Sequence, residues 1–222
     1  MIEALIFDFD GLIVDTEMPE FVAWQEIYHA HGAELLLADW AVSIGTAPEA
    51  FDACAHLEAQ IGRAVDHAHL SRTCKARHIE LAAREAPRPG VETYLSEARR
   101  LGLKIGLASS SSRRWLVDHL ARLGLTDAFD CISCADDVAQ VKPDPAVYTG
   151  ALETLGVAAQ HALAFEDSPN GVRAAQAAGI YCVAVPNDLT RHLDLSHADL
   201  RLYSLADWPL VDLLAEVERR RA

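Results

Sequence analysis

Two aspartates that alternate at the end of an apolar segment are the first residues able to do chemistry. Asp8 and Asp10 follow the apolar residues 4–7, and Gly11 comes next. Alternate residues of a strand point to the same side, so both carboxylates would leave the strand together at its carboxyl end, where open α/β sheets bind ligands. Gly11 permits a sharp turn or a close backbone approach. Alone, the pattern is equally typical of a strand-ending turn.

A run of serines and one lysine form the second and third groups. Ser109–Ser112 follow the apolar residues 103–108. Hydroxyls and N–H groups at a helix N-terminus can bind an anion, although an ordinary N-cap would explain one of these serines. Lys142 precedes Pro143, which favours an extended conformation from which the lysine could reach the sheet. Alone, Lys142 would be interpreted as a solvated surface residue.

Adjacent carboxylates form the fourth group. Glu166 and Asp167 follow the apolar residues 162–165. Neighbouring carboxylates at one strand end repel each other, and a Mg²⁺ ion would stabilise them. The alternative is a helix cap formed by Asp167 or Ser168.

The segments around these groups alternate between strand and helix patterns. Continuous apolar runs are typical of strands buried on both faces, and a Gly directly after a periodic run is a common helix stop. We therefore expect an α/β fold, a doubly wound Rossmann-like parallel sheet. Strands are expected at 4–7, 103–108, 129–132, 162–165 and 180–185, and helices at 91–101, 112–123, 144–155, 170–178 and 205–221.

One long segment carries only helical patterns, and it separates the first strand from the rest of the predicted sheet. These patterns lie at 21–31, 48–61 and 67–86. We expect an inserted α-helical cap domain at 17–87, and a catalytic core formed by 1–16 and 88–222.

The four groups, taken in order, resemble the motifs of the haloacid dehalogenase-like (HAD) hydrolases. The matching stretches are DFDGLIVDTE, GLASSSS, VKPDP and FEDSPNG. The helical insert resembles the subfamily that includes β-phosphoglucomutases and many sugar-phosphate phosphatases. The resemblance covers nearly the whole chain and implies an HAD-like hydrolase that acts on phosphate monoesters.

The resemblance also implies a role for each group. Asp8 would attack phosphorus and form an aspartyl-phosphate. Asp10 would be the general acid–base that protonates the leaving oxygen and later activates water. Lys142 would offset charge on the transferring group, and Ser109 and Ser110 would bind the phosphate.

By the same resemblance the cofactor would be Mg²⁺. Its ligands would be the carboxylates of Asp8 and Asp167 and the main-chain carbonyl of Asp10. Glu166 would be a further ligand or a partner of the ligands. Waters and a substrate oxygen would complete the octahedron.

The substrate is expected to depend on the cap. Mutase relatives carry a His where this chain has Glu20, and basic residues in the loop that corresponds to 43–49, which here lacks Lys and Arg. A mutase must hold a second phosphate, so a hydrolase is favoured. Glu20, Trp24 and Thr46 are expected substrate contacts. As a class, however, the tryptophans, Trp115 among them, are interpreted mainly as packing residues.

Composition narrows the function classes further. The formal net charge of −14 disfavours binding to nucleic acid or to a membrane surface, and five cysteines do not indicate a disulfide framework. The N-terminus lacks the pattern of a secretory signal, so a cytoplasmic location is expected. The expected partner is a small phosphorylated substrate, and the expected state is a monomer or weak homodimer.

Three alternatives remain open. The first is a β-phosphoglucomutase-like sugar-phosphate mutase, which would depend on a bisphosphate activator. The second is a non-catalytic binding protein on the same fold, although intact Asp8, Asp10, Lys142 and Asp167 argue against it. The third is a dehalogenase, which Asp10 disfavours because halide release needs no leaving-group acid.

Overall fold

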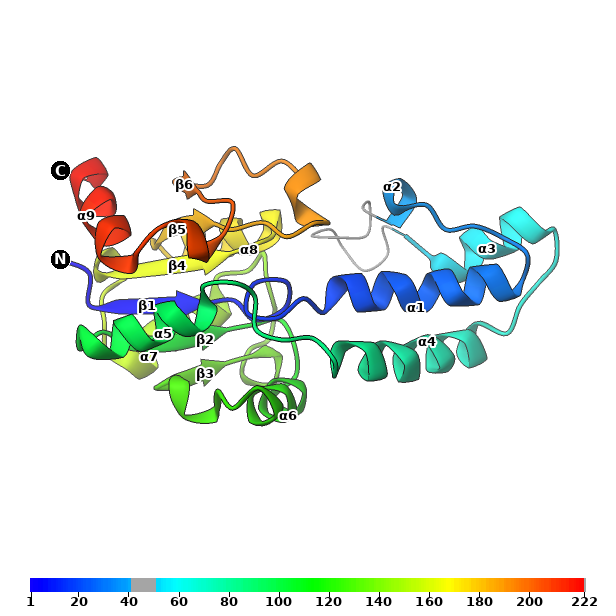
Figure 1. Cartoon of the computed structure of the whole chain (residues 1–222), viewed down its shortest axis with the longest axis horizontal. Helices are drawn as coiled ribbons and strands as arrows, with labels where there is room; N and C mark the ends of the chain where they lie inside the picture. The colour runs from blue at the N-terminus through cyan, green and yellow to red at the C-terminus, as the bar shows by residue number, and fades with distance from the viewer. Residues whose placement is uncertain (41–50, 222) are drawn as a thin grey trace. The chain divides into compact units, whose positions relative to one another are not determined.

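A six-stranded sheet in which every neighbouring pair is parallel lies at the centre of the larger of two units (Figure 1). The computed structural model describes residues 1–40 and 51–221, and the chain divides into one unit of 1–14 and 86–222 and another of 15–85. The sheet order is β3-β2-β1-β4-β5-β6. The strands are β1 (Ala4–Phe7), β2 (Lys104–Ala108), β3 (Cys131–Ser133), β4 (Ala162–Glu166), β5 (Tyr181–Ala184) and β6 (Leu200–Arg201).

Helices cover both faces of this sheet, and alternate side chains of β1 pack into the two hydrophobic cores. Leu5 and Phe7 pack with residues of α5 (Val91–Arg100), α6 (Arg113–Leu123) and α9 (Leu210–Arg221). Ala4 and Ile6 pack with residues of α7 (Ala146–Leu155) and α8 (Pro169–Ala177). Burial on both faces explains why the strands read as continuous apolar runs. The predicted doubly wound α/β fold is confirmed.

The ends of these elements lie close to the predicted positions, with two differences. Strand β6 was not predicted, because two residues carry no periodic signal. The helix expected from 205 starts at Leu210, because Leu205–Asp207 form a separate 3₁₀ turn, η7. The other 3₁₀ turns among the described residues are η3 (Thr126–Ala128), η4 (Ala135–Asp137), η5 (Ala159–His161) and η6 (Thr190–His192).

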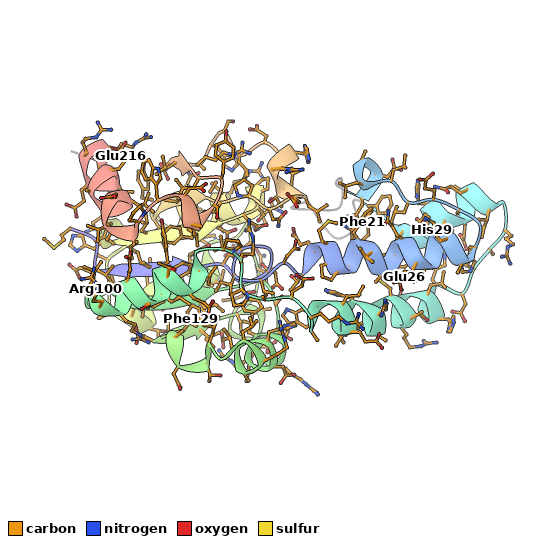
Figure 2. All side chains as sticks on the ribbon, in the orientation of Figure 1. Phe21, Glu26, His29, Arg100, Phe129 and Glu216 are labelled. Atoms are coloured by element: carbon orange, nitrogen blue, oxygen red, sulfur yellow. The ribbon has the colours of Figure 1, made fainter. Side chains whose placement is uncertain are left out.

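The second unit contains helices and connecting turns, and no strand among its described residues. Its helices are α1 (Glu17–Ala30), α2 (Leu37–Trp40), α3 (Ala53–Ile61) and α4 (His67–Ala82). Helices α1 and α4 pack against each other (Figure 2). Arg77 of α4 donates two hydrogen bonds, of 2.8 and 2.9 Å, to the Glu26 carboxylate of α1. None of the helices in the described parts of the chain has the length and apolar character needed to cross a membrane.

A tight loop after β1 turns the chain back toward the core. The N–H of Gly11 donates to the carbonyl of Val14 at 2.8 Å, and Gly11 has a φ of 81°. A Cβ at Gly11 would overlap the Asp167 carboxylate, so this position needs glycine both for its backbone and for its closeness to β4. Arg88 holds the loop by donating to the carbonyls of Gly11 at 2.5 Å and Pro186 at 2.8 Å.

A second close approach occurs where α8 begins beside the end of β4. Ser168 caps this helix by accepting a hydrogen bond from the N–H of Gly171 at 3.2 Å. The Glu166 carboxylate packs so closely on Gly171 that a Cβ there would overlap it. Glu166 has no exposed surface, so its carboxylate has no room to move aside.

We therefore expect Gly171→Ala to lower the free energy of unfolding by roughly 1–3 kcal/mol, the usual penalty for overpacking. Urea unfolding followed by circular dichroism measures this change. Gly150→Ala in α7 is the matched control, because its Cβ would meet only the rotatable Ser133 hydroxyl. Equal stability of the two variants would show that Glu166 does not pack on Gly171.

Candidate active site

The sheet order brings three of the four predicted groups to one edge. Asp8 follows β1, Ser109 follows β2, and Glu166 ends β4, and β1 lies between β2 and β4. Lys142, unlike the other three groups, does not directly follow a strand. It lies in the connection between β3, which ends at Ser133, and α7, and its side chain reaches back to the same edge.

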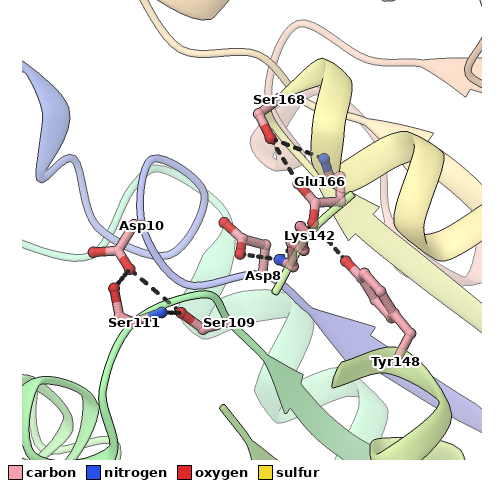
Figure 3. Close-up of polar contacts among 9 residues, drawn as sticks. Asp8, Asp10, Ser109, Ser111, Lys142, Tyr148, Glu166 and Ser168 are labelled. Carbon is pink, nitrogen blue, oxygen red and sulfur yellow. Dashed lines mark hydrogen bonds and ion pairs between the residues drawn. The ribbon is translucent and has the colours of Figure 1, made fainter. Parts of the chain in front are cut away.

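The Lys142 ammonium lies between two buried carboxylates (Figure 3). It donates to Oδ1 of Asp8 and, at 2.6 Å, to Oε1 of Glu166. The Tyr148 hydroxyl donates to the same Glu166 oxygen at 2.6 Å, and the Tyr148 ring centroid lies 5.1 Å from the Lys142 Nζ. The Lys142 side chain is only 6% exposed, so these contacts form away from bulk water.

Burial and charge set the protonation of this group. Burial raises the pKa of Asp8 well above its usual value, the charge of Lys142 acts in the opposite direction, and the charges of Glu166 and Asp10 raise it further. Burial alone would lower the pKa of Lys142, but the charges of Asp8 and Glu166 raise it above the usual value. Lys142 therefore remains an ammonium at neutral pH.

The donor set fits a divalent cation. Asp8, Glu166 and Asp167 are all buried, and each offers a carboxylate oxygen within 4.8 Å of the others. Lys142 pairs with two of these carboxylates, Asp8 and Glu166, and the third lies close to both, so their burial together is costly without a further cation. Oxygen ligands of this kind are those that Mg²⁺ prefers. Asp167 is held in place by Asn187, whose Nδ2 donates to its Oδ2 at 2.9 Å.

Asp10 has a separate set of partners on α6 and the loop before it. Its Oδ2 accepts hydrogen bonds from the hydroxyls of Ser111 at 2.6 Å and Ser109 at 3.4 Å (Figure 3). Its Oδ1 accepts a hydrogen bond from the indole Nε1–H of Trp115 at 2.9 Å. The two acidic side chains of the first motif thus have different partners: Asp8 contacts a cation, and Asp10 accepts hydrogen bonds from neutral donors.

The serine run divides into different roles. Ser109 is buried, and its hydroxyl both donates to Asp10 and accepts from the N–H of Ser111 at 3.0 Å. Ser112 caps α6, as the N-cap interpretation expected for one serine. The side chain of Ser110, a predicted phosphate contact, is exposed at the surface.

Two of the predicted cap contacts lie in the second unit, and the third lies outside the described residues. Glu20 is half-buried in the first turn of α1, in the second unit, and Trp24 is buried in the same helix. Thr46 lies outside the described residues. Their predicted roles stay predictions.

Sequence reasoning missed four residues that contact the predicted groups. The interpretation of Trp115 as a packing residue was incomplete, because its indole also bonds Asp10. Ser111 was hidden among equivalent serines. Tyr148 and Asn187 had no motif to mark them, although Tyr148 lies on α7 just beyond Lys142 and could have been found from that proximity.

Known proteins resemble this chain over nearly its whole length. Residues 5–185 match the haloacid dehalogenase-like hydrolase family. The protein YhcW of Bacillus subtilis, provisionally named a phosphatase, is 49% identical and covers 96% of this chain and 97% of its own length. The validoxylamine A 7'-phosphate phosphatase of Streptomyces hygroscopicus subsp. limoneus is 29% identical, with coverages of 94% and 98%.

Solved structures agree with these relatives. The protein CbbY of Rhodobacter sphaeroides, in a mutant form in complex with xylulose-(1,5)bisphosphate, matches with a TM-score of 0.72 and 33% identity over 93% of this chain and 96% of its own. A β-phosphoglucomutase of Clostridium difficile matches with a TM-score of 0.77 and 25% identity over 99% and 98%. With the family match and the close relative YhcW, these findings show that this chain belongs to the haloacid dehalogenase-like hydrolases.

Proposed function

We propose that this chain is a Mg²⁺-dependent phosphatase that hydrolyses a small phosphorylated metabolite, of the sugar-phosphate kind, through an aspartyl-phosphate. One observation carries the proposal: Asp8 is paired with the buried Lys142, while Asp10, two residues on, is held by neutral donors. Two relatives named as phosphatases support the reaction class, and the xylulose-(1,5)bisphosphate complex of CbbY supports the substrate class.

The reaction follows from these roles. An Asp8 oxygen forms a bond to phosphorus while the bond between phosphorus and the ester oxygen breaks, and the ester oxygen takes a proton from Asp10 and leaves as an alcohol. Water then attacks phosphorus, gives a proton to Asp10, and releases phosphate and the free Asp8 carboxylate. Lys142 stays charged throughout and offsets negative charge on Asp8 and on the transferring group.

Asp8, Asp167 and the main-chain carbonyl of Asp10 would hold the Mg²⁺ ion. When bound, Mg²⁺ supplies positive charge that offsets the carboxylates and the phosphoryl oxygens. Glu166 is engaged by Lys142 and Tyr148, so we assign it mainly to positioning Lys142. Ser109 borders Asp10 and is the serine best placed to contact phosphate.

The first test is the nucleophile. Asp8→Asn should reduce phosphate release from a panel of sugar phosphates by roughly 10³-fold or more, because an amide cannot replace the attacking carboxylate. The wild-type chain, quenched during turnover, should carry a hydroxylamine-sensitive phosphoryl group that Asp8→Asn lacks. Asp127→Asn, on the exposed turn η3, is the control and should retain full activity. Conversion of a sugar phosphate to an isomer only on adding a bisphosphate would identify a mutase instead.

The second test is the cation. EDTA should abolish phosphate release, and Mg²⁺ should restore it. Independently of activity, Mg²⁺ at about 100 times its Kd should stabilise the wild-type chain by roughly 2.7 kcal/mol, measured as a rise in Tm. Asp167→Asn should lose this rise, whereas Asp127→Asn should keep it. A Tm that does not respond to Mg²⁺ in the wild-type chain would contradict the proposed metal site.

The third test concerns Tyr148, whose hydroxyl bonds the Glu166 partner of Lys142. Tyr148→Phe removes the hydroxyl that donates to Glu166, so it should lower the free energy of unfolding by about 1–3 kcal/mol and also lower kcat/KM for phosphate esters. Tyr94→Phe is the matched control: it removes a hydroxyl that donates to the Trp208 carbonyl at 2.8 Å. It should lower stability without changing kcat/KM. Equal kcat/KM in both variants would show that Tyr148 does not support the reaction.

A further inference from the structure

The indole of Trp115 makes a polar contact with Asp10. The indole Nε1–H donates to Oδ1 of Asp10 at 2.9 Å, although Trp115 and Asp10 come from different segments of the chain. The indole N–H can only donate a hydrogen bond. In its contact with Asp10 the carboxyl oxygen is therefore always the acceptor.

The surroundings of Trp115 fix the direction of its indole. Its backbone N–H is bonded to the Ser112 side chain that caps α6, at 3.4 Å. Its ring meets the buried His119 ring edge-on, with centroids 4.1 Å apart, and the His119 ring in turn packs on Phe9 at 6.0 Å. Leu116 and Leu120 anchor the same helix in the core, and the partly buried Trp115 packs against that core.

The other oxygen of Asp10 faces partners of another kind. Oδ2 meets the hydroxyls of Ser111 and Ser109, at 2.6 and 3.4 Å. A serine hydroxyl can rotate to donate or to accept, so it can bond this oxygen with or without a proton on it. The indole therefore fixes Oδ1 and leaves Oδ2 as the oxygen that can exchange a proton.

We propose that Trp115 is a positioning residue that orients the Asp10 carboxyl group for proton transfer to the leaving group. The proposal rests on the function proposed above. In the first step the Asp8–phosphorus bond forms, the ester oxygen–phosphorus bond breaks, and the ester oxygen takes the proton from Asp10. Loss of the indole N–H removes the hydrogen bond to Oδ1 and so weakens the hold on the orientation that this transfer needs.

This role predicts a dependence on the leaving group. An alkyl phosphate such as glycerol 2-phosphate releases a basic alkoxide that needs the proton, whereas p-nitrophenyl phosphate releases a stable anion that does not. The experiment compares kcat/KM, which reports on steps up to leaving-group departure, for both esters. Trp115→Phe keeps an aromatic ring against His119 but lacks the N–H.

For Trp115→Phe we expect kcat/KM to fall by roughly 10-fold or more on glycerol 2-phosphate, part of the 10²–10⁴-fold that general acid catalysis provides. On p-nitrophenyl phosphate the fall should be less than about 3-fold. In an Asp10→Ala background, Trp115→Phe should cause no further loss, because the two residues act as a unit. Trp208→Phe, a partly exposed tryptophan next to α9, should change neither ester. An equal fall on both esters, or no fall on either, would overturn the proposal.

A spectroscopic measurement separates this inference from the proposed function. The chain has four tryptophans, and Trp115→Phe identifies the indole N–H resonance of Trp115 in an NMR spectrum. Asp10→Ala should move that resonance while leaving the Trp208 resonance in place. If the resonance of Trp115 does not move, the inference fails even when hydrolysis is observed. If no ester is hydrolysed by the wild-type chain but the resonance moves, the proposed function fails while the contact stands.

Discussion

The ion pair of Lys142 with Asp8 and Glu166 is the interaction on which the rest of the candidate active site depends. Buried charges are costly unless they are paired and hydrogen-bonded, and here one ammonium serves two carboxylates inside the protein. The Tyr148 hydroxyl completes the set by donating to Glu166. The pairing ties the ends of β1 and β4 to the connection that carries Lys142. It still leaves the buried carboxylates in excess, which is the state that a divalent cation would stabilise.

The turn after β1 gives two nearby aspartates different surroundings. Asp8 stays in line with the strand and meets Lys142, whereas Asp10 turns toward α6 and meets hydroxyls and an indole N–H. Gly11 makes this possible, because a side chain there would overlap Asp167. A carboxylate beside a fixed cation suits a nucleophile, and a carboxylate among neutral donors suits proton transfer. The different proposed roles of Asp8 and Asp10 thus depend on one tight loop.

We expect the reaction class and the substrate to depend on different parts of the chain. The parallel order places β1 between β2 and β4, so motifs far apart in sequence meet around Asp8. Relatives that match this chain over nearly all its length nevertheless include named phosphatases and a β-phosphoglucomutase. A shared fold does not fix the substrate. We expect discrimination between substrates to come from residues outside the candidate active site, such as the predicted substrate contact Glu20.

The sequence by itself determined the parallel α/β fold, the helical insert and the edge at which the four motifs meet. These features follow from local signals: continuous apolar runs, glycines after helices, and carboxylates directly after strands. Only the tertiary structure decided that Lys142 reaches back to Asp8 from a loop, that Ser111 contacts Asp10 while Ser110 is exposed, and that Trp115 does more than pack. The two-residue strand β6 likewise had no signal in the sequence. Such contacts depend on where loops turn and on which residues distant in sequence are folded together, and no local pattern of residue types encodes that.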